Sequence, residues 1–314
     1  MARKREDVLT INNFPLNGGA FVPTGGNQWF VNTQTDTTAR GADTNRGNSW
    51  DKALRTMSRA LTLAETGDTI YFVGDIREEL TGSSLKFDIT IVGAGMKHHP
   101  DSPGTGYLVG ASTWRAPASP TSATPLLKVR GRGWKFVNIL FDCPVDAAAV
   151  KLERNALSDT SEYDASHAQF IDCRFTDGKY GIQNDGGASF VTVDGCQFQR
   201  LNESGGAGII CTSTSVAVPL NWVIKNSEFH NNASHILSSM SYSSIRNNTF
   251  GRFTATLSID IDDQPSANQG EYNVIWGNYL SGTYGATAYP PGSNNEWGGN
   301  FNSLSGGVTA ADPT

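Results

Sequence analysis

One short sequence pattern recurs seven times between Trp134 and Phe301 and restricts the folds that are open to this chain. Each copy closes with an aromatic residue, which we take as position zero. In most copies an apolar residue stands five positions earlier, Asn, Asp or Gly three earlier, and a small residue two earlier; the exceptions are Glu296, Trp276 and Ile139. A second short apolar run follows each copy. Short strands that repeat with Gly and Asn turns, and without helices between them, predict a parallel β-solenoid. The closing aromatics are Phe141, Phe175, Phe198, Phe229, Phe250, Tyr279 and Phe301.

The spacing of the copies indicates coils with loops attached. Successive closing aromatics are 34, 23, 31, 21, 29 and 22 residues apart, and one coil of a β-helix takes on the order of 20 residues. The longer intervals therefore carry loops, which lie near residues 155–165, 202–219 and 260–271. In a stack these loops should leave from one edge, a place that repeat proteins often use for binding.

Stacking at about 4.8 Å per coil also predicts the interior. We expect the seven closing aromatics to point inward in one column. Asn226 and Asn247 should form a ladder of hydrogen bonds between coils. Cys173 and Cys196 occupy equivalent positions, where a pair of buried thiols is favoured over a disulfide.

The segment before the repeats predicts a cap for the first coil. Residues 28–32 and 69–73 read as strands, and a helix near residues 50–66 lies between them, with Asn48 or Ser49 as its N-cap. An apolar stripe runs along this helix at helical spacing. Because the first coil of a solenoid exposes an apolar end, we expect the helix to cover it. The stripe consists of Leu54, Met57, Leu61 and Ala64.

Residues 29–70 carry a set of motifs in a fixed order. They are Trp29-Phe-Val, Gly41-x-Asp43-x-Asn45-x-Gly47, Trp50-x-x-Ala53-Leu54-x-Thr56-x-x-x-Ala60-Leu61 and Gly67-Asp68-Thr69-Ile70. This order resembles the opening of the pectate-lyase-like right-handed parallel β-helix proteins. The resemblance implies an all-β fold, a right-handed single-stranded parallel β-helix (solenoid) with an N-terminal amphipathic capping helix. That superfamily holds polysaccharide lyases, glycosidases and phage tailspikes or other virion spikes, so the resemblance implies architecture more narrowly than activity.

The chain divides into an N-terminal arm at residues 1–27, a β-helix at 28–301 and a C-terminal tail or cap at 302–314. The arm begins with Arg3, Lys4 and Arg5 and lacks the apolar segment of a signal peptide. We expect it to contact a neighbouring subunit or other virion proteins, and the resemblance implies a homotrimer. Without a run of about 18 apolar residues, membrane insertion is not expected. With a net charge of −6, a nucleic-acid partner is not expected either.

The candidate catalytic residues are Asp260, Asp262 and Asp263, because glycosidases require two neighbouring carboxylates. Alternation along a strand places Asp260 and Asp262 on one face. The Gly-His-Gly and Arg-x-Lys signatures that accompany such a pair in polygalacturonase-like members are missing, so a solvated charged flank is the favoured alternative. Lys225 and Arg246 each fall four residues before their aromatics and are expected to point outward in line.

Three aromatic residues in loop-like contexts, Trp114, Tyr284 and Tyr289, are candidates for stacking on host polysaccharide. Trp134 and Trp222 instead recur seven residues before their aromatics and are expected to be structural. No Cys, His and Asp cluster completes a metal site around His98 and His99, and no cofactor is expected.

These observations favour a phage virion protein, a short β-helical spike or capsid-decoration protein made in the host cytoplasm, with host glycans as a candidate contact. The alternative is a polysaccharide depolymerase, either a hydrolase or a lyase, and a non-viral binding protein is a third hypothesis.

Overall fold

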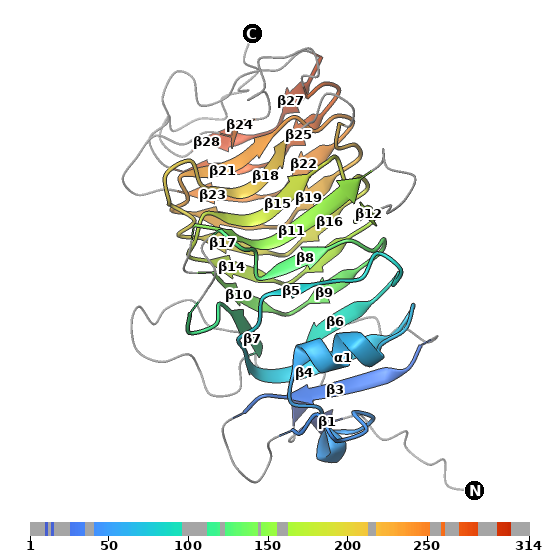
Figure 1. The fold of residues 1–314 in the computed structure, drawn as a ribbon. Coiled ribbons are helices and arrows are strands. Elements are labelled where there is room, and N and C mark those ends of the chain that lie inside the picture. Colours follow the sequence, from blue (N-terminus) through green and yellow to red (C-terminus); the bar gives the residue numbers. More distant parts are fainter. Residues whose placement is uncertain are drawn as a thin grey trace, which may run out of the picture.

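The computed structural model describes residues 26–34, 41–95, 112–119, 123–143, 146–155, 163–212, 218–251, 270–281 and 294–302, and the strand positions 10–11, 14–15 and 259–260. The chain winds as a right-handed parallel β-helix, and its coils stack from the N-terminal to the C-terminal end (Figure 1). This confirms the predicted fold class. In the described part of the chain no helix is long and apolar enough to cross a membrane.

Three faces of parallel strands surround the core, and we call them the first, second and third face in the order that the chain visits them. In the described part of the chain the first face has ten strands. They are β3 (Gln28–Asn32), β4 (Thr69–Ile76), β6 (Thr90–Gly93), β9 (Lys135–Val137), β13 (Gln169–Ile171), β16 (Thr192–Asp194), β19 (Val223–Lys225), β22 (Ser244–Arg246), β25 (Val274–Trp276) and β27 (Glu296–Gly298).

The second face follows the first after a two-residue turn in each regular coil. It begins at the end of β4 and continues through β7 (Ser112–Arg115), β10 (Leu140–Asp142), β14 (Arg174–Thr176), β17 (Gln197–Gln199), β20 (Glu228–His230), β23 (Thr249–Gly251), β26 (Tyr279–Ser281) and β28 (Phe301–Asn302).

The third face closes each coil. It contains β5 (Leu80–Thr81), β8 (Leu127–Val129), β11 (Ala148–Asn155), β15 (Tyr180–Asp185), β18 (Ala207–Thr212), β21 (Ser234–Ser238) and β24 (Ile259–Asp260), and β12 (Tyr163–Asp164) pairs antiparallel with β11. The segments 156–162, 213–217 and 261–269 all follow strands of this face. The extra residues of the three longer intervals therefore all follow strands of one face, and the segments themselves lie outside the described residues.

A column of phenylalanine rings fills the centre of the second face. Phe141, Phe175, Phe198, Phe229 and Phe250 are fully buried, and successive ring centroids lie 5.1, 4.7, 4.6 and 4.9 Å apart with nearly parallel planes. This column confirms the inward stacking of the first five aromatics. Burying an aromatic side chain in a close-packed interior stabilises the fold by several kcal/mol.

The last two copies of the repeat are shifted by one residue from the predicted alignment. Phe250 pairs with Leu280, and Tyr279 pairs with Thr249 and Phe301. Tyr279 and Phe301 consequently point outward and are 46% and 51% exposed. The prediction that these two rings lie in the inward column is therefore wrong, and buried Leu280 continues the column instead.

The asparagine ladder lies one position later than predicted. Asn226 and Asn247 are exposed and have positive φ angles of 52° and 55°, a backbone conformation that Asn adopts more readily than most residues. The buried ladder is formed by Asn248, Asn278 and Asn300. Asn278 Oδ1 accepts a hydrogen bond from the Asn248 N–H (2.9 Å), and Asn300 Oδ1 accepts one from the Asn278 N–H (2.9 Å).

The helix at the N-terminal end is shorter than predicted. A 3-10 turn covers Trp50–Lys52, and α1 spans Met57–Leu63 with Thr56 as its N-cap. Asp43 fixes the start of α1, because its carboxylate accepts hydrogen bonds from the backbone N–H groups of Arg55 and Thr56. Buried Met57, Ala60 and Leu61 face the core. Figure 1 shows α1 in line with the third face, before β5.

The two cysteines and the two tryptophans that were expected to be structural are buried, as the sequence predicts. Cys173 and Cys196 are buried free thiols. Trp134 and Trp222 are fully buried, and their indole N–H groups donate to the backbone carbonyls of Lys86 (2.8 Å) and Ala188 (2.9 Å).

Within the arm the structure describes β1 (Thr10–Ile11) and β2 (Phe14–Pro15), which pair antiparallel, and residues 26–27. The contacts predicted for residues 1–27, and the predicted role of residues 302–314, stay predictions.

Candidate functional site

A column of exposed side chains follows the turn between the third and the first face, eight residues before the second-face column. The backbone N–H groups of the first four members each donate to a backbone carbonyl of the next coil, with N–O distances of 2.8 to 3.1 Å. We call this column the aromatic edge, because four of its five members have aromatic rings. They are His167, Phe190, Asn221, Tyr242 and Tyr272.

Every member of the aromatic edge has a left-handed backbone. The φ angles are 63°, 59°, 57°, 53° and 60° in chain order. A side chain other than Gly or Asn in this conformation costs about 1 to 2 kcal/mol. Gly133 and Asn294 hold the equivalent positions in other coils, so the turn itself requires no aromatic residue. The bulky rings at Phe190, Tyr242 and Tyr272 are therefore not explained by the fold.

The rings stack in two exposed pairs. The centroids of His167 and Phe190 lie 4.8 Å apart with an interplanar angle of 4°, and those of Tyr242 and Tyr272 lie 5.0 Å apart at 16°. Phe190, Tyr242 and Tyr272 remain 49%, 59% and 49% exposed. Asn221 lies between the two pairs. Five positions in successive coils span roughly 19 Å along the solenoid axis.

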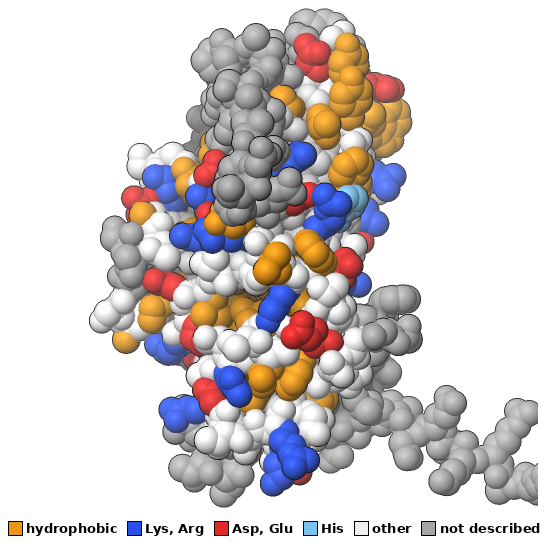
Figure 2. All heavy atoms as spheres, turned by 45° about the vertical axis from the view of Figure 1, so that its right-hand side comes forward, with side chains coloured by type: hydrophobic (Ala, Val, Ile, Leu, Met, Phe, Trp, Pro, Cys, Tyr) orange, Lys and Arg blue, Asp and Glu red, His pale blue; other side chains and the backbone are white. Residues whose placement is uncertain are grey.

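The outer surface of the first face adjoins the aromatic edge. Its column nearer the second face runs through Asp194, Lys225, Arg246 and Trp276 in strand register. Lys225 Nζ lies 3.1 Å from Asp194 Oδ2, whereas Trp276 is 51% exposed. The predicted outward alignment of Lys225 and Arg246 is confirmed. Figure 2 shows hydrophobic side chains gathered at the C-terminal end of the molecule.

The third face carries a network of charged side chains near the same edge. Lys151 Nζ lies 2.9 Å from Asp185 Oδ2 and 3.7 Å from Glu153 Oε1, and Arg130 Nε donates to Glu153 Oε2 at 2.6 Å. Glu153 and Asp185 are paired in register on neighbouring strands. Two carboxylates therefore lie close together here, although both are held by cations.

Next to this network, Asp164 accepts hydrogen bonds from Arg132 and from the Ser166 N–H. Burial alone would raise the pKa of this carboxyl, but these hydrogen bonds and the charge of Arg132 lower its pKa below the usual range. Asp164 is therefore a fixed anion at neutral pH and acts as a structural group rather than a proton donor.

The catalytic candidates lie only partly within the described residues. Asp260 ends β24 and pairs with Leu237, and Asp262 and Asp263 lie outside the described residues. Because β24 is four strands from β11, Asp260 lies roughly 19 Å from Glu153 along the stack. The third-face network and Asp260 therefore do not form one carboxylate pair.

The structure corrects one of the three predicted sugar-binding residues. Trp114 lies in strand β7, is fully buried and stacks near Phe141, and its indole N–H donates to the Glu78 carbonyl at 2.9 Å. A ring in the core cannot stack on a sugar. Tyr284 and Tyr289 lie outside the described residues.

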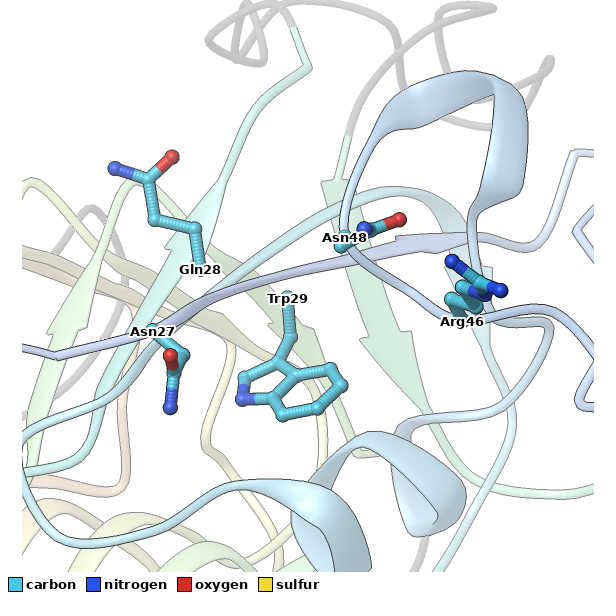
Figure 3. Close-up of a pocket in the computed structure, with 5 residues that line it drawn as sticks. All are labelled: Asn27, Gln28, Trp29, Arg46 and Asn48. Atoms are coloured by element: carbon cyan, nitrogen blue, oxygen red, sulfur yellow. The ribbon is translucent and has the colours of Figure 1, made fainter.

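A shallow hollow lies on the first coil beside β3 (Figure 3). Its lining consists of Asn27, Gln28, Trp29, Arg46 and Asn48. The indole N–H of Trp29 is not available to a ligand there, because it already donates to Asp68 Oδ2 at 2.8 Å. Since the aromatic edge begins four first-face strands later, the hollow and the edge are separate features.

Among the residues that the structure describes, no group of three or more His, Cys, Asp or Glu residues is placed to hold a metal ion.

The aromatic edge was missed from the sequence because its members share a backbone conformation rather than a residue type. A signal did exist. When the copies are aligned on the second-face column, the position eight residues earlier is Gly133 or Asn221 in some coils and Phe190 or Tyr242 in others. A bulky ring at a position that elsewhere takes Gly or Asn indicates a role outside the fold.

Comparisons with known proteins agree with the fold. The family model described as right handed beta helix region matches residues 158–308. Among solved structures, a GH136 lacto-N-biosidase from Eubacterium ramulus is similar over 88% of this chain, with 11% identity and a TM-score of 0.54. This chain covers only 56% of that enzyme's chain.

Two further structures are similar at lower TM-scores. The pectate lyase Pel9A has 11% identity and a TM-score of 0.49, with 88% of this chain and 74% of that chain covered. A rhamnogalacturonan lyase has 12% identity and a TM-score of 0.41, with 90% and 88% covered. No curated protein matches the sequence.

Proposed function

We propose that this protein is a carbohydrate-active β-helix protein that binds a polysaccharide along the aromatic edge. The observation that carries the proposal is the pair of exposed ring stacks, His167 with Phe190 and Tyr242 with Tyr272. The fold does not need these rings, and each is held in a costly backbone conformation.

The chemistry of the edge suits a sugar chain. An aromatic ring has a negative face that attracts the polarised C–H groups on one side of a pyranose, and its flat apolar surface is buried in the contact. Backbone hydrogen bonds hold the turn at four of the five positions, and the rings support one another in pairs, so binding orders few side chains and loses little entropy. Asn221 between the two ring pairs offers an amide to hydroxyl groups.

Cleavage of the bound chain is the second part of the proposal, which makes the protein a polysaccharide depolymerase. The candidates remain Asp260, Asp262 and Asp263. Asp260 ends the third-face strand that precedes the turn of Tyr272, so the acidic cluster starts from the coil beside the second ring pair. A hydrolase would use two of these carboxylates as acid and as base or nucleophile.

Binding is tested by affinity electrophoresis and calorimetry against a panel of neutral and acidic polysaccharides. The double variant Phe190→Ala, Tyr242→Ala should bind its polymer about tenfold more weakly or worse. Phe301→Ala is the matched control, because Phe301 is 51% exposed but lies on the second face. Unchanged affinity in the double variant, or an equal loss in the control, contradicts the proposed binding surface.

Cleavage is tested by the release of reducing ends or of unsaturated products. Asp260→Asn, Asp262→Asn and Asp263→Asn should each abolish release and leave binding intact. Asp177→Asn serves as the control, because Asp177 is an ion-paired surface carboxylate beside Arg200. Wild-type protein that binds a polymer and releases no product removes the depolymerase part and leaves a binding protein.

A virion spike is the second candidate function, and the basic start of the arm at Arg3, Lys4 and Arg5 favours it. In that case residues 1–27 attach a homotrimer to other virion proteins. Deletion of residues 2–20 should leave the β-helix folded and remove the protein from assembled particles. Particles that retain the shortened protein would contradict this role.

A further inference from the structure

Another exposed ring, outside the aromatic edge, lies across the first face from that edge, at the turn toward the second face. Trp276 ends β25 and is 51% exposed. The ring lies against Gly298 and Gly299 of the next coil. A Cβ atom at Gly298 would overlap the six-membered ring, and one at Gly299 would lie 3.1 Å from Cε2. The two glycines therefore form a shelf that supports one side of the indole.

A ring held on a backbone shelf is ready to bind. Most exposed indoles sample several rotamers, and a ligand that fixes one of them pays for the lost freedom. Contact with the shelf restricts the Trp276 rotamers before a ligand arrives. The contact also leaves about half of the side chain open to solvent.

A cation lies next to this ring. Arg246 pairs in register with Trp276 on the neighbouring strand, so the backbones of the two residues lie roughly 4.8 Å apart. Arg246 is exposed, and no carboxylate in the part of the chain that the structure describes pairs with it. Lys225, one strand further along the column, differs because it forms an ion pair with Asp194.

The other side of the same coils carries the second pair of the aromatic edge. Tyr242 precedes β22 and Tyr272 precedes β25, so Trp276 and these two rings flank the outer surface of two neighbouring strands. Between them lie Ser244 and Val274, of which Val274 is 40% exposed. The surface thus offers a ring at each end, and the guanidinium lies beside the indole.

We propose that the outer surface of β22 and β25 binds an acidic sugar unit, whose pyranose stacks on Trp276 and whose carboxylate or sulfate pairs with Arg246. A guanidinium forms two parallel hydrogen bonds with such a group, and an indole takes the apolar side of the ring. This inference rests on the proposed function and deepens it: the polysaccharide is anionic, and it crosses the first face toward Trp276 rather than following the aromatic edge alone.

The test compares acidic polysaccharides with their carboxyl-reduced or desulfated forms, which keep the same backbone. The panel contains alginate, polygalacturonate, hyaluronan and dextran sulfate. Wild-type protein should bind at least one acidic polymer about tenfold more tightly than its neutral form, and this difference should shrink at high salt because mobile ions screen exposed charges.

Arg246→Gln should lose the preference for the acidic form and keep the affinity for the neutral form, whereas Trp276→Ala should weaken both. Arg200→Gln is the matched control, because Arg200 is exposed but paired with Asp177. Circular dichroism confirms that each variant is folded, and Arg246→Lys should restore part of the preference.

The outcomes separate the two proposals. Equal affinity of the wild-type protein for acidic and neutral forms, or an unchanged preference in Arg246→Gln, overturns the acidic site and leaves the aromatic edge standing. Weaker binding in the Phe190 and Tyr242 double variant, together with a preference that is lost in Arg246→Gln and kept in Arg200→Gln, supports both proposals. Failure of the wild-type protein to bind any polymer of the panel overturns both.

Discussion

Two columns of rings run along this solenoid, and their surroundings are opposite. The phenylalanine column of the second face is fully buried, with centroids 4.6 to 5.1 Å apart. The aromatic edge stacks its rings at nearly the same spacing, 4.8 and 5.0 Å, in solvent. The coil repeat imposes the spacing in both cases. Burial therefore distinguishes rings that stabilise the fold from rings that are free to bind.

The largest expected difference is in the free energy of unfolding. Phe229→Ala removes a ring that packs between Phe198 and Phe250 and should cost about 3 to 5 kcal/mol. Tyr242→Ala removes a ring that is 59% exposed and should cost about 0.5 kcal/mol. Urea denaturation measures both values. Equal losses would show that the exposed rings belong to the structural core.

A smaller difference is expected between two neighbouring asparagines at the turn beside the buried column. Asn248 accepts a hydrogen bond from the Ser227 N–H and donates one to the Ile224 carbonyl. Asn248→Ala leaves these buried groups without partners and should cost about 1 to 3 kcal/mol.

The neighbour serves as the control. Asn247→Gly should change the stability by no more than about 0.5 kcal/mol, because Asn247 is exposed and glycine adopts its φ of 55° without strain. A larger loss of stability from Asn247→Gly than from Asn248→Ala would contradict the ladder at Asn248. It would favour the ladder position that the sequence predicted, at Asn247.

The smallest difference is a reversal of sign at one residue of the aromatic edge. Alanine normally stabilises a protein relative to glycine. At Phe190, with φ of 59°, Phe190→Gly should be more stable than Phe190→Ala by about 1 kcal/mol. Thermal or chemical denaturation of the two variants measures this difference. Alanine as the more stable residue would mean that the turn is not strained there, and the argument from strain to function would fail.

The sequence predicted the fold because the repeat appears in residue types that the interior requires. Phe141 to Phe250 recur at coil spacing, and only a stack of coils buries them all. The alignment failed at Tyr279, because we chose the aromatic residue over its neighbour Leu280. Gly277 and Gly299, which have positive φ like Asn247, give the correct register at that point.

The candidate site was harder to predict, and the reason is physical. Exposed positions tolerate most side chains, so the pattern of residue types there contains little information. Trp114 follows a long Pro, Ser and Gly-rich stretch and was placed in a loop, although its strand continues the second face. Phe190 and Tyr242 become conspicuous only when their left-handed backbone is known. The side chains of Asp260, Asp262 and Asp263 lie outside what the structure describes, so their role stays a prediction.

The left-handed turns have a consequence for how such a protein can change. At this edge the same left-handed turn carries Gly133, His167, Phe190, Asn221 or Tyr242 in different coils. A substitution there leaves the buried column of the second face untouched, and its effect reaches no further than the ring that stacks on it from the neighbouring coil. Ligand preference can therefore be altered by a substitution in a single coil. The solenoid that presents the edge side chains remains the same.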